Sequence, residues 1–96
     1  MDDIFCEAIK SQKRVRIVYD GTKRVIEPHT FGYDKNGNLK VRASQAGGYS
    51  ESGNYDLKLF IIDKISDIKL MDENFGINSY YKSGTDKGIP EIICQI

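Results

Sequence analysis

A two-residue alternation of apolar and basic side chains is the feature of this sequence that most limits its fold. It runs through KRVRIVY at positions 13–19, where valine, isoleucine and tyrosine share one parity and two arginines share the other. Successive side chains of a strand point to opposite faces, so this period predicts a strand with one face in a core. Asp20-Gly21 follows, a pair suited to a tight hairpin turn because glycine tolerates positive φ. The run after the turn predicts a second strand over 23–33.

The same reasoning predicts three more strands. Asp34 to Gly37 forms a second hairpin turn, and alternation resumes from Leu39 to Ser44. The nearly continuous apolar run at 57–62 predicts a strand buried on both sides, followed by a turn and a last strand around 68–70. Pro28 cannot donate a ladder hydrogen bond, so it marks an edge or a bend. The Gly- and Ser-rich stretch 44–56 predicts a long loop, which we expect to be the most mobile segment.

The two ends of the chain have different patterns. Asp2 and Asp3 precede an apolar stripe with helical spacing, which predicts a short helix ending near Ser11 or Gln12. The apolar ending predicts a strand near 92–96, added to a sheet edge of the same or a neighbouring chain. The fold class is therefore mainly β, with one N-terminal helix and five short strands in a highly curved sheet. Closing that sheet into a barrel would remove its exposed edges.

Length and composition indicate one ordinary globular domain. The chain has 96 residues, 40% of them hydrophobic and 29% charged. The acidic start is unlike a secretion signal, which predicts a cytoplasmic location. In that reducing compartment we expect Cys6 and Cys94, at opposite ends of the chain, to be small buried side chains rather than a disulfide.

Positive charge is concentrated in one part of a neutral chain. Between Lys10 and Arg42 there are nine basic and three acidic residues, whereas residues 43–96 hold five basic and eight acidic ones. A local positive field attracts phosphate groups even when the net charge is zero. The alternative interpretation is that these cations are solvated faces that prevent aggregation through strand edges.

Three stretches carry a resemblance to a known family. AIKSQKRVRIVYDG, with its aromatic at Tyr19, KRVIEP, with Arg24 and Pro28, and LKLFIIDKISDIKL, with Phe60, Asp63 and Ile65, occur in this order. Together they resemble the bacterial WYL domain, from about position 4 to position 70. The Trp-Tyr-Leu stretch that names the family falls on Leu39-Lys40-Val41, and lysines replace two arginines of its late run, at positions 58 and 64.

The resemblance implies an Sm-like barrel over 1–72 and a C-terminal extension over 73–96. It also implies a non-enzymatic module that binds a ligand or single-stranded nucleic acid, in a regulatory or helicase context. No winged helix or helicase domain is expected within these residues, so the copy would act alone or with such a partner protein. The residues expected to bind are basic or aromatic: Arg14, Arg16, Arg24, Lys40, Arg42, Lys58, Lys64, Tyr49 and Tyr55. Lys58 and Lys64 are the strongest candidates for ligand contact, because they occupy the family's ligand positions.

Other functions have less support in the sequence. A protein-interaction or homo-oligomerisation module, using the apolar tail and the Tyr-rich loop, is the alternative. His29 is the only histidine and makes a poor metal site near one glutamate, because zinc takes three or four ligands. Tyr19 is expected in the core with its hydroxyl at the rim, in preference to stacking on a ligand. No arrangement of residues argues for catalysis, and no cofactor is expected.

Overall fold

The computed structural model describes residues 2–48 and 56–96. The helix α1 (Asp2–Ser11) leads into the hairpin strands β1 (Lys13–Tyr19) and β2 (Thr22–Tyr33). They are followed by β3 (Leu39–Gly48), β4 (Lys58–Ile61), the 3-10 helix η1 (Ile62–Lys64) and β5 (Ile65–Asn74). An irregular segment then leads to β6 (Glu91–Gln95). The predicted helix, the hairpin turns and the mainly β class are confirmed.

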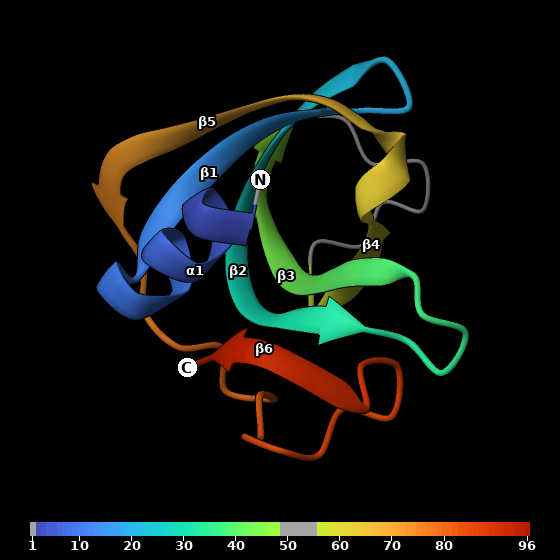
Figure 1. Cartoon of the computed structure of the whole chain (residues 1–96). Helices are drawn as coiled ribbons and strands as arrows, with labels where there is room; N and C mark the ends of the chain where they lie inside the picture. The colour runs from blue at the N-terminus through green and yellow to red at the C-terminus, as the bar shows by residue number, and fades with distance from the viewer. Residues whose placement is uncertain (1, 49–55) are drawn as a thin grey trace.

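The described strands form one antiparallel sheet in the order β4-β3-β2-β1-β5, with β6 paired to β2. The sheet is open, because β4 and β5 are its two ends and η1 connects them. Figure 1 shows how strongly β1, β2 and β3 bend and how β6 lies along the last part of β2.

The bend of β2 explains how one strand has three partners. Its first half pairs with β1 up to Ile26, and its last four residues pair with β6 from Thr30 onward. Between these halves the register with β3 shifts at Pro28, which confirms the predicted bend. The shift also changes which parity is inside, since Ile26 and Phe31 are both fully buried. Thus β2 leaves one neighbour and takes another where proline interrupts the ladder.

The core lies between α1 and the concave side of the sheet. Phe5, Ala8 and Ile9 of the helix are buried against Val15, Ile17 and Phe31, among other strand residues. The ring centroids of Phe5 and Phe31 are 5.3 Å apart and the rings are stacked. The helical stripe and the strand alternation therefore meet in one apolar layer, as their periods predict.

One expected boundary and one expected burial pattern were wrong. β3 continues through Gly48 rather than ending at Ser44, because Gly47 and Gly48 pair with Val25 and Arg24 of β2. The predicted loop therefore loses its first five residues, and its part at 49–55 lies outside the described residues. β4 is not buried on both sides, since only Phe60 of its four residues is buried. It is the last strand of the sheet on that side, so one of its edges has no ladder partner among the described strands.

The two cysteines are joined, contrary to expectation. Cys6 of α1 and Cys94 of β6 form a disulfide with their Cα atoms 5.7 Å apart. The two cysteines are 88 positions apart in the sequence, but they become neighbours when β6 pairs with β2 beside the helix. Separation along the chain was therefore a poor guide to their distance in space. The predicted C-terminal strand is confirmed as part of this chain's own sheet, and the disulfide ties it to α1.

Candidate ligand-binding site

Three residues from the stretches that resemble the WYL domain, Tyr19, Arg24 and Lys58, lie around the ring of Phe60. Tyr19, at the end of β1, packs edge-on against that ring with centroids 5.1 Å apart. The Arg24 guanidinium lies 5.0 Å from the Tyr19 centroid and 6.0 Å from that of Phe60. The Lys58 ammonium lies 5.6 Å from the Phe60 centroid. We call these four residues the Phe60 cluster, and cation–π attraction holds its two positive charges on aromatic faces.

Local structure positions each member of the cluster. Arg24 faces Ile17 directly across the β1–β2 ladder, so its parity turns it inward and only 7% of it is exposed. Its Nε donates to the Thr22 hydroxyl over 3.2 Å. The Tyr19 hydroxyl accepts the Ile61 backbone N–H over 3.1 Å, which links β1 to β4. Tyr19 thus has the core position with a hydroxyl at the rim that the sequence predicts.

Lys58 lies close to a second cation, the guanidinium of Arg24. Burial, followed by repulsion from Arg24, lowers the pKa of Lys58 below its usual 10.5. Its Nζ also donates to Gln45 Oε1 over 3.3 Å, and Gln45 is itself buried. Like charges held together at a protein surface create a positive potential that attracts an anion. Gln45 is a member of this site that charge patterning could not identify.

Four of the predicted cations lie outside the cluster, each paired with a carboxylate. The pairs are Arg14 with Glu27 and Glu73, Lys40 with Asp34, Arg42 with Asp86, and Lys64 with Asp20. Hairpin pairing brings Glu27 and Asp34 to their partners, whereas Glu73 and Asp86 come from distant parts of the sequence. Three of the nine basic residues between Lys10 and Arg42 are thus paired with acids, as is Lys64.

Of the three remaining predicted residues, only Arg16 lies in the described part of the chain. Arg16 is exposed on β1, directly opposite the exposed Lys69 of β5. Like charges directly opposite on neighbouring strands repel, so this pair adds a second positive spot on the outer face. Tyr49 and Tyr55 lie outside the described residues.

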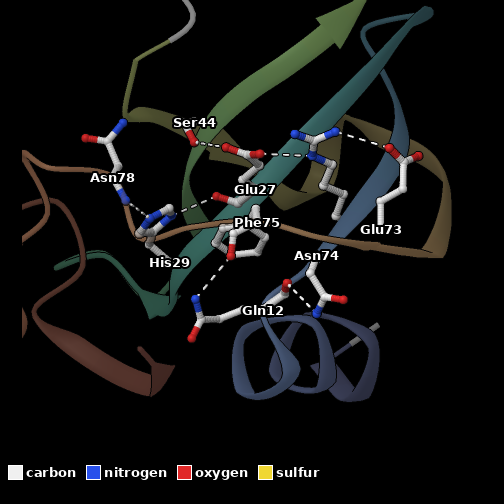
Figure 2. A network of polar contacts seen from close by, with 9 residues as sticks. Gln12, Glu27, His29, Ser44, Glu73, Asn74, Phe75 and Asn78 are labelled. Carbon is white, nitrogen blue, oxygen red and sulfur yellow. Dashed lines mark hydrogen bonds and ion pairs between the residues drawn. The ribbon is translucent and has the colours of Figure 1, made fainter.

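A polar network joins the sheet to the C-terminal extension (Figure 2). Glu27 accepts from Arg14 Nε and from the Ser44 hydroxyl, both over 2.9 Å. Arg14 also donates to Glu73 over 3.2 Å. Glu27 therefore holds Ser44 of β3 and Arg14 of β1 together, and through Arg14 the network reaches Glu73 at the start of the extension.

His29 is fully buried, and both of its nitrogens are in use. The Asn78 backbone N–H donates to Nε2 over 3.0 Å, so Nδ1 carries the proton and donates to the Glu27 carbonyl over 2.8 Å (Figure 2). Burial lowers the pKa of His29 below 6.5. The ring thus holds the extension as a neutral side chain. Within residues 2–48 and 56–96, no group of three or more His, Cys, Asp or Glu could hold a metal ion.

A pocket of about 220 Å³ between β3 and the extension was not predicted from the sequence. It is lined by Arg42, Leu57, Tyr80, Tyr81, Lys82, Thr85 and Asp86. Arg42 binds Asp86 with two parallel hydrogen bonds of 2.8 and 3.0 Å, which lower the pKa of Asp86. Of its lining residues only Arg42 was predicted to bind, and the adjacent tyrosines at 80 and 81 were a further sequence signal that the weak patterning around them made hard to interpret.

Comparisons with protein-family models, with curated proteins and with solved structures gave no match to the chain. Among the described residues, α1 is the one α-helix, and it is too short and too polar to cross a membrane.

Proposed function

We propose that this protein is a non-enzymatic module that binds a phosphate-bearing ligand, a nucleotide or a single-stranded nucleic acid, at the Phe60 cluster. One observation carries the proposal: Arg24 and Lys58 share one aromatic ring although their charges repel. An anion at this point would gain from both charges. Lys58 is the more accessible cation and would contact the phosphate, whereas Arg24 would supply positive potential from beneath.

The order of the strands supports a WYL-like module with an Sm-like fold over residues 1–72. One helix precedes five consecutive antiparallel strands, and β1 pairs with both β2 and β5. Pairing of the first strand with the fifth curls the sheet toward a barrel. The hydrogen bond from Ile61 to the Tyr19 hydroxyl brings β4 toward the same side. A regulatory or nucleic-acid-processing role, with a helicase or regulator as partner, is proposed from this likeness alone.

Fluorescence anisotropy with a short labelled oligonucleotide, at low and moderate salt, tests the proposal. We expect a single strand to bind more tightly than a duplex of equal length, because only unpaired bases can stack on tyrosine side chains. Lys58→Gln should weaken binding and reduce the slope of log K against log salt by ~0.7, the value for one phosphate of a single strand.

Lys64→Gln is the matched control, because Lys64 is exposed, is paired with Asp20 and is not a member of the Phe60 cluster. It should leave the slope unchanged. Absence of binding at low salt and high protein concentration would end the nucleic-acid proposal. Binding that Lys58→Gln leaves intact would move the site to the Arg16–Lys69 pair.

A second function, self-association through β6, is favoured by one feature of that strand. Within the described residues β6 pairs with β2 alone, so its other edge has no ladder partner. The adjacent Ile92 and Ile93 are 38% and 42% exposed, which puts apolar side chains on both faces of an edge strand. Such edges pair with other strands. Light scattering tests this directly: a dimer that persists in high salt and is lost in Ile93→Lys supports association, and a monomer at all concentrations refutes it.

The compartment is proposed from the redox state of the cysteines. Disulfides persist in oxidising compartments and are rare in the cytosol, so the Cys6–Cys94 bond weighs against the cytoplasmic location expected from the acidic start. The two compartments can be distinguished by alkylating free thiols inside intact cells and then measuring the mass of the chain. Two alkylated thiols would support the cytoplasm, and none would support an oxidising compartment.

A further inference from the structure

We propose that the pocket between β3 and the C-terminal extension binds a planar aromatic ring that carries an anionic group. Its lining shares no residue with the Phe60 cluster, so this inference and the proposed function can fail independently. A pocket of about 220 Å³ is smaller than the roughly 300–1,000 Å³ typical of drug-sized ligands. It therefore suits a ligand with one small ring system.

The aromatic wall of the pocket is an exposed tyrosine. Tyr80 lines the pocket and is 75% exposed, the largest value among the large hydrophobic residues that the structure describes. Its neighbour Tyr81 is half-buried and fixed, because its hydroxyl donates to the Ile96 carbonyl over 3.0 Å. A planar ligand that covered Tyr80 would remove apolar surface from water and gain stacking contacts.

The polar part of the pocket is positive. Both Asp86 oxygens accept from Arg42, and Oδ1 also accepts the Gly88 backbone N–H over 2.9 Å. Arg42 donates to Asp86 through Nε and Nη2, and among the described residues its Nη1 has no partner. Lys82 lines the same pocket, and no carboxylate of the described residues forms an ion pair with it. Among the described residues, one lysine without an ion pair and the two N–H groups of Arg42 Nη1 select an anion over a cation.

The segment that builds the pocket is held in place before a ligand arrives. The Asn78 side chain accepts the Tyr80 N–H over 2.9 Å, and the Thr85 hydroxyl donates to the Lys82 carbonyl over 2.7 Å. The Gly84 N–H donates to the Gln95 side chain of β6 over 3.0 Å. Side chains that fix an irregular segment in this way reduce the entropy lost on binding.

NMR titration of the oxidised protein, following backbone amides, tests the inference with three probes. Uridine monophosphate has both ring and anion, uridine has only the ring, and inorganic phosphate has only the anion. We expect the monophosphate to shift amides of residues 80–88 and to bind more tightly than either single-feature probe. Uridine or phosphate binding equally well would overturn the combined recognition. Shifts confined to the surroundings of Lys58 would overturn this site and support the Phe60 cluster instead.

Three variants of exposed residues test the role of the tyrosine. Tyr80→Ala should weaken binding of the monophosphate roughly tenfold, the scale of one base stacking on an aromatic side chain. Tyr80→Phe should retain binding, because the ring is kept. Ile77→Ala is the matched control, since Ile77 is 53% exposed in the same segment but does not line the pocket. Equal affinity of Tyr80→Ala and the unmodified protein, with unchanged melting temperature, would refute the proposal.

Discussion

Reduction of the Cys6–Cys94 disulfide is expected to lower the stability of this protein without unfolding it at 25 °C. The bond closes a loop across 88 positions, nearly the whole chain. In the chain-entropy treatment, a loop of this length restricts the unfolded state by ~4.6 kcal/mol at 25 °C. Measured effects are typically about 2–4 kcal/mol, so we expect about 3 kcal/mol.

The folded state should survive this loss because other contacts also hold β6 and the extension. Ile89 is fully buried, Phe75 is 7% exposed, and Asn78 donates to His29. The β2–β6 ladder adds backbone hydrogen bonds. A domain of this size gains or loses about 4–8 °C in melting temperature per kcal/mol, so reduction should lower the melting temperature by roughly 12–24 °C.

Thermal unfolding followed by circular dichroism, with and without a dithiol reductant, measures the effect. Mass spectrometry of alkylated protein must show two free thiols in the reduced sample and none in the oxidised one. The double variant Cys6→Ser with Cys94→Ser is the control, and its melting temperature should not respond to reductant. Equal melting temperatures for fully oxidised and fully reduced protein would refute the loop-closure reasoning. Disulfide-linked dimers in place of a cross-linked monomer would refute the pairing itself.

Three further predictions concern packing and protonation. Gly32→Ala should destabilise the fold by about 1–3 kcal/mol in urea unfolding, because the new Cβ would lie 2.8 Å from Ile89 Cγ2 and closer still to a β6 carbonyl, whereas Gly76→Ala, with open space around it, should cost far less. Burial lowers the pKa of His29 below 6.5, so the unfolded state binds a proton at a higher pH than the folded state does. The free energy of unfolding should therefore be level above pH 6.5 and fall as the pH drops below it. A free energy of unfolding that stayed level below pH 6.5 would contradict the burial of His29. Hydrogen bonds from Asn38 and Lys40 lower the pKa of Asp34 from 3.8 to about 2. The difference in free energy of unfolding between the unmodified protein and Asp34→Ala should therefore be constant above pH 4 and shrink toward pH 2. A difference that stayed constant down to pH 2 would contradict the lowered pKa.

Local patterning determined the elements of this protein. The 3.6-residue stripe of α1, the two-residue period of β1 to β3 and the glycine turns after β1 and β2 are properties of short stretches. Pro28 marked the bend of β2 for an equally local reason, the missing backbone N–H. These features could be predicted because backbone sterics and alternation act over a few residues.

Tertiary structure decided which distant residues meet. The bond between Cys6 and Cys94 and the pairing of Arg42 with Asp86 depend on where the end of the chain docks, and no local pattern encodes this. The continuous apolar run of β4 wrongly predicted burial on both faces, because hydrophobicity alone cannot show that a strand will be the last in its sheet.

The candidate binding residues also depend partly on local sequence and partly on tertiary structure. Charge counts located the cations, but the pairing of strands and the docking of the extension decided that Arg14, Lys40, Arg42 and Lys64 would each meet an acid. Only Arg24 and Lys58 came to share the ring of Phe60. Electrostatic interaction falls off with distance in space and not along the chain, so a basic segment becomes a binding surface only where folding leaves its charges together.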